Sequence, residues 1–132
     1  MLPLIMLVDD DPLLGEIVRY KLEAIGYRVT LVAASDEACA IAKKLMPDLI
    51  VLDSMMPVLS GPQVLAELKR TPATKHIPVI MLTARKGQDD VVQALRAGAG
   101  DYLTKPFIPE ELALRIESLL SRQGVFGDVQ RA

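Results

Sequence analysis

The chain has no tryptophan, one cysteine (Cys39) and one histidine (His76) among its 132 residues. A single cysteine excludes an internal disulfide and suits a reducing compartment, so we expect a cytoplasmic protein. A lone cysteine and a lone histidine are also too few for a typical zinc site. Cys39 lies in an alanine-rich stretch typical of a helix, and we interpret it as buried filler rather than a reactive thiol.

The chain also lacks long hydrophobic runs and an excess of either charge. The apolar N-terminus, residues 1–8, has no preceding basic segment and meets three aspartates at once, so we expect neither a signal peptide nor a membrane partner. The 15 basic and 17 acidic residues give a formal net charge of −2. Because such a balance provides no basic surface for phosphates, we expect no direct nucleic-acid binding.

The length of 132 residues fits one domain with one core, and 51% of the residues are hydrophobic. We expect this domain to comprise residues 1–122. Residues 123–132 contain two glycines and have mixed polarity, which predicts a tail or the start of a linker.

Five short runs, at 4–8, 29–32, 49–52, 79–82 and 101–104, predict five strands that alternate with five amphipathic helices. This alternation is typical of an α/β fold with a parallel sheet. The first, third and fourth runs are apolar on both faces, so we place them in the centre of the sheet and the other two at its edges. Right-handed crossovers then favour a doubly wound, flavodoxin-like sheet with the order 2-1-3-4-5.

Local signals predict where the helices begin. Asp11 and Ser35 are expected to cap the first and second helices, the second running to Pro47. Ser60 and Gln63 have the spacing of a capping box for the third helix, and Gly87 precedes the fourth. The first helix has apolar residues at helical spacing: Leu14, Ile17, Val18, Leu22 and Ile25.

The predicted strand order brings acidic residues to one crevice, because Asp9 and Asp10 end the first strand and Asp53 ends the third. Asp53 alone would fit a turn-capping role equally well. Two like charges ~4 Å apart repel by ~4 kcal/mol at an effective dielectric of ~20, so the cluster needs a cation. Carboxylate oxygens favour a hard ion such as Mg²⁺. Lys105 and Thr83, at the ends of two further strands, add an ammonium and a hydroxyl.

Such a group of side chains is suited to phosphoryl transfer. A carboxylate can attack a phosphoryl group and form an aspartyl phosphate, and that reaction requires mainly positioning and charge neutralisation. Taken singly, Lys105 is most simply a surface lysine and Thr83 a strand-end hydroxyl. Their coincidence at neighbouring strand ends favours the functional interpretation.

With these residues, the chain resembles the receiver domain of bacterial two-component response regulators over residues 4–121. The resemblance rests on several motifs in the right order: Val8-Asp9-Asp10-Asp11-Pro12, Leu52-Asp53 with Met56-Pro57 and Gly61, Thr83-Ala84, and Lys105-Pro106-Phe107. It implies a signalling switch rather than an enzyme, with a sensor histidine kinase or a phosphotransfer protein as partner.

The resemblance also assigns roles to single residues. It implies that Asp53 accepts the phosphoryl group and that Asp9, Asp10, Asp53 and the backbone carbonyl of Met55 hold Mg²⁺. It further implies a cis peptide bond before Pro106. Thr83 and Tyr102 match a switch pair that transmits phosphorylation to the face formed by the fourth helix, the fifth strand and the fifth helix.

Three residues near the phosphoacceptor are expected to modulate the site, and two of them, Met55 and Arg85, occupy positions that vary in this family. Met55 cannot orient a water molecule by hydrogen bonding, Ala84 leaves room for a donor histidine, and Arg85 is expected to shield the phosphate or to pair with an acid.

The fifth helix and the segment before it are similar to receivers attached to winged-helix DNA-binding domains, which implies transcription regulation. Those receivers dimerise through the face named above. Asp101 and Arg115 match one ion pair of that interface and Glu111 matches half of another, whose basic partner is absent here. We therefore expect a homodimer that is weaker or more apolar than usual. The alternative is that Asp101 and Arg115 pair within one chain or with water.

Three other classes of protein deserve comparison. A phosphatase of the haloacid-dehalogenase type needs an acid two residues after its nucleophile, where this chain has Met55 after Asp53, although Asp11 after Asp9 is a partial match. A flavodoxin-like binding module needs a loop rich in Ser, Thr and Gly after the first strand, and here that loop is acidic. A receiver-like scaffold that is not phosphorylated would not need the acids, the hydroxyl and the lysine together.

Overall fold

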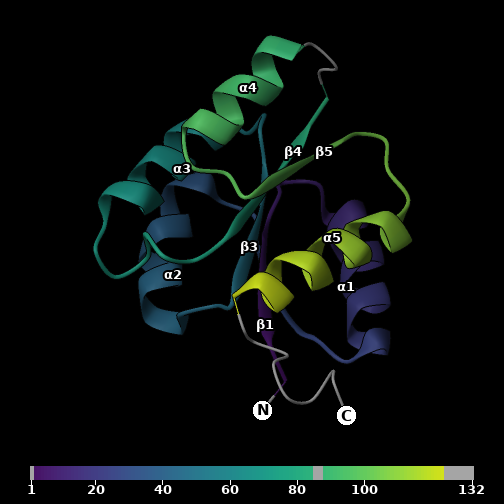
Figure 1. Cartoon of the computed structure of the whole chain (residues 1–132). Coiled ribbons are helices and arrows are strands. Elements are labelled where there is room, and N and C mark those ends of the chain that lie inside the picture. Colours follow the sequence, from purple (N-terminus) through teal and green to yellow (C-terminus); the bar gives the residue numbers. More distant parts are fainter. Residues whose placement is uncertain (1, 85–87, 124–132) are drawn as a thin grey trace.

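The computed structural model, which describes residues 2–84 and 88–123, contains a parallel sheet whose strands follow the predicted order, β2-β1-β3-β4-β5 (Figure 1). The strands are β1 (Leu4–Val8), β2 (Arg28–Val32), β3 (Leu49–Asp53), β4 (Val79–Thr83) and β5 (Asp101–Thr104). All four strand pairs are parallel. The fold class predicted from the alternation of strands and helices is therefore confirmed.

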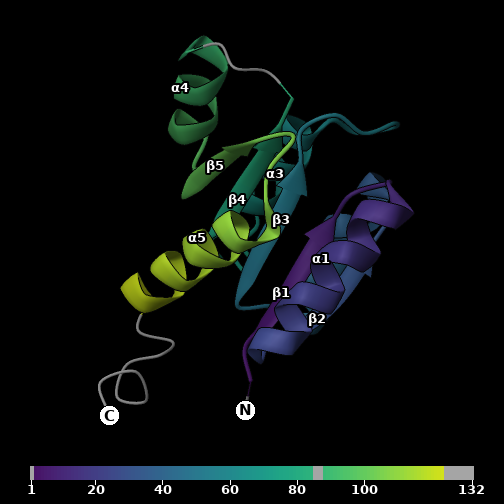
Figure 2. The same ribbon diagram turned by 90° about the vertical axis from the view of Figure 1, so that its right-hand side faces the viewer.

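Helices cover both faces of the sheet. They are α1 (Pro12–Ile25), the short 3-10 helix η1 (Ser35–Glu37), α2 (Ala38–Leu45), α3 (Gly61–Arg70), α4 (Gln88–Arg96) and α5 (Pro109–Arg122). Figures 1 and 2 show α1 and α5 together on one face, with α2 and α3 on the other. Helix α4 lies on the α2–α3 side, near β5.

The side chains of each strand alternate between two apolar clusters. In β1, Ile5 and Leu7 pack toward α1 and α5, whereas Met6 and Val8 pack toward α2 and α3. The same alternation continues along β3, β4 and β5 because successive side chains of a strand point to opposite faces. Residues that follow one another at a strand end therefore face opposite sides of the sheet.

Burial of the strands agrees with their predicted positions. Every residue of β3 is buried, as expected for a central parallel strand, whereas β2 is only partly buried at the edge. Burying one Leu, Ile or Val side chain contributes about 1.5–3 kcal/mol. The apolar run that ends at Asp53 is therefore a rigid base for that carboxylate.

The predicted caps of α1 and α3 are confirmed. The Asp11 carboxylate accepts hydrogen bonds from the backbone N–H groups of Leu13 and Leu14, and Pro12 is the first helical residue. Ser60 and Gln63 form a reciprocal capping box at the start of α3. These contacts satisfy backbone donors that a helix leaves unpaired at its first turn.

Ser35 is not a helix cap, contrary to the prediction. It begins η1, and its buried hydroxyl donates to the Pro57 carbonyl at 2.7 Å and accepts from the Leu59 N–H at 3.0 Å. The hydroxyl thereby ties η1 to the loop between β3 and α3. Helix α2 also ends at Leu45, two residues before Pro47.

The buried face of α1 is narrower than the apolar pattern of its sequence, with Gly15, Val18 and Leu22 buried. Ile17 and Ile25 belong to the apolar pattern that predicted α1, but they are 48% and 53% exposed. The start of the fourth helix at Gly87 lies outside the described residues.

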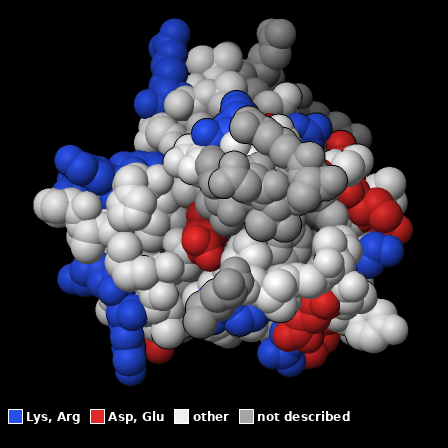
Figure 3. Space-filling model, turned by 60° about the horizontal axis from the view of Figure 1, so that its bottom comes forward, with Lys and Arg blue, Asp and Glu red and all other residues white. Residues whose placement is uncertain are grey.

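Basic side chains gather along the left edge of the face in Figure 3, on the side of α2 and α3. The last turns of these helices carry Lys43, Lys44, Lys69 and Arg70. Cations at the C-terminus of a helix interact favourably with its dipole, which accounts for this arrangement without a ligand. Within the described ranges, no helix has the length and hydropathy needed to cross a membrane.

Candidate functional site

The carboxyl ends of β1 and β3 bring three aspartates together, as the strand order predicted. Carboxylate oxygens of Asp9, Asp10 and Asp53 all lie within 4.8 Å of one another. Asp9 and Asp53 are 7% and 5% exposed, whereas Asp10 is exposed. Two buried acids and one accessible acid therefore line a crevice that is open to solvent on the Asp10 side.

Lys105 supplies the positive charge of this crevice. Its Nζ atom lies 3.0 Å from Oδ2 of Asp9 and 3.3 Å from Oδ1 of Asp53. The residue follows β5, where its backbone N–H donates to the Thr83 carbonyl at 2.7 Å, and the Lys105–Pro106 peptide bond is cis, as the resemblance implied. Lys105 thus links the two buried carboxylates.

The protonation of Asp53 and Lys105 reflects burial and mutual charge. Burial raises the pKa of the Asp53 carboxyl, the neighbouring Asp9 charge raises it further, and Lys105 opposes both effects. For Lys105, burial alone would lower the pKa, but the Asp9 and Asp53 carboxylates raise it above its usual value. Lys105 therefore stays positively charged and interacts with both carboxylates.

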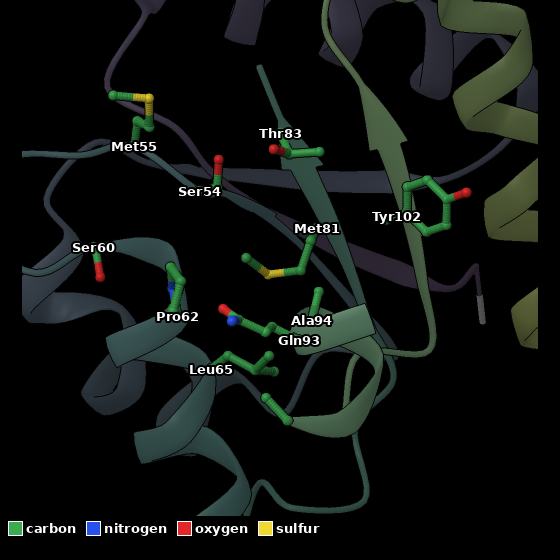
Figure 4. A pocket seen from close by; sticks show the side chains of 11 residues that line it. Ser54, Met55, Ser60, Pro62, Leu65, Met81, Thr83, Gln93, Ala94 and Tyr102 are labelled. Atoms are coloured by element: carbon green, nitrogen blue, oxygen red, sulfur yellow. The ribbon is translucent and has the colours of Figure 1, made fainter. Parts of the chain in front are cut away.

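The alternation of strand side chains separates two groups of site residues. Asp9, Asp53 and Lys105 converge at the crevice, whereas the side chains of Thr83 and of Ser54, the residue after Asp53, line a pocket on the α3–α4 side. Figure 4 shows the hydroxyls of Ser54 and Thr83 close to the upper end of this pocket, below Met55. Tyr102 lines the same pocket from β5, and its hydroxyl points away from the other labelled residues (Figure 4).

Met55 and Ala84, which were predicted to modulate the site, are both exposed. The Met55 side chain is 63% exposed, and its backbone N–H donates to Oδ1 of Asp53 at 3.3 Å. Ala84 follows β4 and is exposed. The third residue predicted to modulate the site, Arg85, lies outside the described residues.

The charged residues that were predicted to lie at a dimer interface form ion pairs within one chain. Nη1 of Arg115 donates to both carboxylate oxygens of Asp101 at 3.1 Å, and its Nη2 donates to Glu111 at 3.3 Å. The intrachain pairing that the sequence left open as an alternative is therefore the arrangement in this structure.

Sequence reasoning did not place Ser54 in the pocket, and it did not detect how closely Gly61 approaches the end of β3. The alternation of side chains along a strand could have placed Ser54 in the pocket, because the preceding residue, Asp53, points to the opposite side of the sheet. A Cβ atom on Gly61 would lie 2.4 Å from the Asp53 carbonyl oxygen, so this position tolerates no side chain without a shift of the backbone. No sequence signal reveals that contact.

The donor set of the crevice fits Mg²⁺. Three carboxylates within 4.8 Å offer the oxygen ligands that hard divalent ions prefer, and the exposed Asp10 leaves room for retained water molecules. Lys105 only partly balances the three negative charges, so a divalent cation would relieve the remaining repulsion.

The acid cluster and Lys105 lie at the switch point of a doubly wound sheet, which is where such folds bind ligands. Residues 5–117 match the model of the response regulator receiver domain, and the chain belongs to this family. It is thus a receiver domain of the two-component response regulator type.

Curated relatives are transcriptional regulators about twice as long. The phosphate regulon transcriptional regulatory protein PhoB of Rhizobium meliloti is 41% identical over 122 residues, which cover 92% of this chain and 54% of that protein. The DNA-binding dual master transcriptional regulator RpaA of Synechocystis is 43% identical over 121 residues, 92% of this chain and 50% of the relative. The chain therefore spans about half the length of these relatives.

Solved structures agree with the family assignment. A putative response regulator from Chloroflexus aurantiacus has a TM-score of 0.86 and 33% identity, covering 92% of this chain and 99% of that one. The receiver domain of the sensor histidine kinase PA1611 from Pseudomonas aeruginosa, with a magnesium ion in its active-site cleft, has a TM-score of 0.78 and 36% identity, covering 92% and 97%.

Proposed function

We propose that the protein is a phospho-accepting switch, in which Asp53 takes a phosphoryl group from a sensor histidine kinase or a phosphotransfer protein. The observation that carries this proposal is the convergence of Asp9, Asp53 and Lys105, with Nζ of Lys105 within 3.3 Å of both carboxylates. The protein acts as a signal carrier in the cytoplasm, promoting only its own phosphorylation and dephosphorylation.

The side chains divide the reaction between them. An oxygen of Asp53 attacks the phosphorus atom, the bond between phosphorus and the donor imidazole nitrogen breaks, and an aspartyl phosphate forms. Lys105 balances negative charge on the phosphoryl oxygens, and the Thr83 hydroxyl donates a hydrogen bond to one of them. The exposed side chain of Met55, whose backbone N–H contacts Asp53, limits the approach of water.

Asp9, Asp10, Asp53 and the backbone carbonyl of Met55 are the groups that would hold Mg²⁺. When bound, the ion supplies further neutralisation of the phosphoryl oxygens and of the acid cluster. The support for this assignment is the proximity of the three carboxylates and the magnesium ion in the related cleft of PA1611.

The direct test is phosphorylation by a small donor. Incubated with acetyl phosphate and Mg²⁺, the protein is expected to gain one phosphoryl group per chain, measured as intact mass. The same incubation with EDTA is the control and should yield little product. If no mass increase occurs at any Mg²⁺ concentration, the proposed function is wrong.

Mg²⁺ affinity should depend chiefly on Asp10, the accessible acid of the cluster. We expect Asp10→Ala to weaken Mg²⁺ binding by about 100-fold while leaving the metal-free fold intact or slightly more stable, because one repulsive charge is removed. Titration calorimetry measures the affinity, since the chain has no tryptophan. Asp36→Ala, at an exposed acid in η1, is the matched control; equal affinities in the two variants would contradict the assignment.

The phosphorylated state should be long-lived because Met55 cannot orient an attacking water molecule. Met55→Asn introduces an amide at an exposed position beside Asp53 and should accelerate dephosphorylation by about tenfold. The decay of the phosphorylated mass after removal of the donor measures this rate. Met55→Leu keeps an apolar side chain and should decay like the wild type. An unchanged or slower decay in Met55→Asn would refute this role.

Phosphorylation is proposed to act on the face formed by α4, β5 and α5. Thr83 would move toward the phosphoryl group and Tyr102 would turn inward, which changes the surface around β5. Support comes from the shared pocket that both residues line. By analogy with the transcriptional regulators named above, the output would be transcription regulation, with residues 1–122 as the receiver and 123–132 as a tail or linker.

A homodimer through this face would require Arg115 to exchange its intrachain partners for those of a second copy. In the presence of beryllofluoride, we expect sedimentation to detect a weak dimer that Arg115→Ala weakens by about tenfold, since an exposed ion pair contributes about 0–1 kcal/mol and two symmetric pairs are lost. Arg122→Ala, in the last turn of α5, is the control. A monomer in all samples at high concentration would exclude the dimer.

A further inference from the structure

A pocket of about 260 Å³ lies between α3, α4 and strands β4 and β5, and Ser54, the residue after Asp53, is part of its lining. Figure 4 shows the Met81 side chain near its centre, with Leu65 and Ala94 toward the lower end and Ser54 and Thr83 toward the upper end. The pocket therefore has an apolar lower part and a hydroxyl-bearing upper end.

Small side chains in α4 and just after its end create this space. Ala94 and Ala97 lie one helical turn apart and both line the pocket, so neither fills the gap between α4 and the sheet. Across from them, Leu65 and the Met81 thioether provide an apolar wall. Because none of the described residues that line the pocket is charged, a charged ligand would lose its hydration without gaining a partner.

The size of the pocket limits the ligand. A cavity of about 150 Å³ is enough to bind benzene, whereas drug-sized ligands occupy about 300–1,000 Å³. At about 260 Å³, this pocket suits one or two fused rings. A polarizable thioether such as that of Met81 also favours aromatic over aliphatic occupants.

We infer that this pocket binds a small neutral aromatic molecule with one hydrogen-bonding group, of the indole or phenol class. The ring lies against Met81 and Leu65, and the polar group reaches the hydroxyls of Ser54 and Thr83. The inference also extends to regulation, and this part rests on the proposed function. The ligand opposes phosphorylation because it occupies the space into which Tyr102 would turn.

Indole is the probe for the binding site. Titrated into the isotopically labelled protein, it should produce saturable shifts of the backbone amide signals of Leu65, Met81 and Ala94, with a dissociation constant of about 1 mM or tighter. Ala94→Leu and, independently, Ala97→Leu should weaken binding at least tenfold by filling the pocket. Ala40→Leu, at an exposed position on α2, is the matched control and should bind like the wild type.

The Ala97→Leu variant guards against a folding artefact, because Ala97 follows α4, is exposed and tolerates a larger side chain. Circular dichroism melting must confirm that the variants are folded. Absence of saturable shifts in the wild type, or undiminished binding in a folded Ala97→Leu, would overturn the site without affecting the proposed phosphorylation of Asp53.

Beryllofluoride tests the regulatory part. Occupancy of the phosphoacceptor site should lower indole affinity at least tenfold and, by thermodynamic reciprocity, saturating indole should lower beryllofluoride affinity by the same factor. Tyr102→Ala removes the competing ring, so beryllofluoride should no longer affect indole binding. Equal affinities with and without beryllofluoride in the wild type would overturn the antagonism.

Discussion

Asp53→Asn should abolish phosphoryl uptake from acetyl phosphate, because an amide oxygen is a far weaker nucleophile than a carboxylate. Intact mass after incubation with Mg²⁺ gives the yield. Asp11→Asn is the matched control: Asp11 caps α1 close to the crevice, and Asn caps helices as well as Asp does, so uptake should persist. If Asp53→Asn gains phosphate with the wild-type yield, the phosphoacceptor has been wrongly assigned.

The same variant should be more stable than the wild type when no metal is present. Two ionised carboxylates at the separation of Asp9 and Asp53 repel by about 3–4 kcal/mol at an effective dielectric of ~20, and Lys105 offsets most of this repulsion. We therefore expect a gain on the order of 1 kcal/mol, or about 4 °C in Tm for a domain of this size. Thermal melting near neutral pH in EDTA measures it.

The pH dependence of this gain follows from the raised pKa of Asp53, which is caused first by burial and then by Asp9. Because the folded state holds the proton more tightly than the unfolded chain, ionised Asp53 destabilises the fold above its folded-state pKa. The penalty disappears as the pH falls from there toward the ordinary value of 3.8. The stability difference between Asp53→Asn and the wild type should therefore shrink on acidification; a difference that grows would contradict this account.

The strand order and the converging acids could be predicted because they depend on local patterns. Apolar runs bounded by Asp, Pro and Gly specify where strands end, and the contrast between fully apolar and mixed runs specifies which strands are central. Once the order is known, Asp9 and Asp53 must be neighbours. Lys105 follows from the same reasoning, since it lies just beyond β5.

Other features depend on contacts between distant segments, which single-sequence patterns do not encode. The Ser35 hydroxyl bridges to Pro57 and Leu59, and a Ser before a helix looks like a cap whether or not such partners exist. Val58, in the same loop, has φ of 72°, an uncommon conformation for a β-branched residue that nothing in its sequence signals. The ion pair between Arg115 and Asp101 within one chain likewise depends on how α5 packs beside β5.

The contacts of Gly61 likewise could not be predicted from the sequence. Replacing this residue is expected to have the largest effect on stability. In sequence it is a turn residue after Ser60, but in the structure α3 begins against the end of β3, where the Gly61 N–H donates to the Ser54 carbonyl at 3.0 Å. A Cβ atom there would lie 2.4 Å from the Asp53 oxygen and 2.6 Å from the Ser54 Cα. These are backbone atoms of a buried strand end, so they cannot rotate away as a side chain could.

Gly61→Ala should therefore lower the free energy of unfolding by about 3 kcal/mol, or roughly 10 °C in Tm, through forced backbone displacement. Since the displaced atoms belong to Asp53 and Ser54, phosphorylation should also slow by about 10- to 100-fold at temperatures where the variant is folded. Gly15→Ala is the matched control: its Cβ would meet only the movable Leu31 side chain at 3.3 Å, and alanine favours the helix by up to about 1 kcal/mol. Denaturant melts and the rate of mass gain separate the two effects. A Gly61→Ala variant as stable and as reactive as the wild type would show that α3 does not hold Asp53 and Ser54 in place.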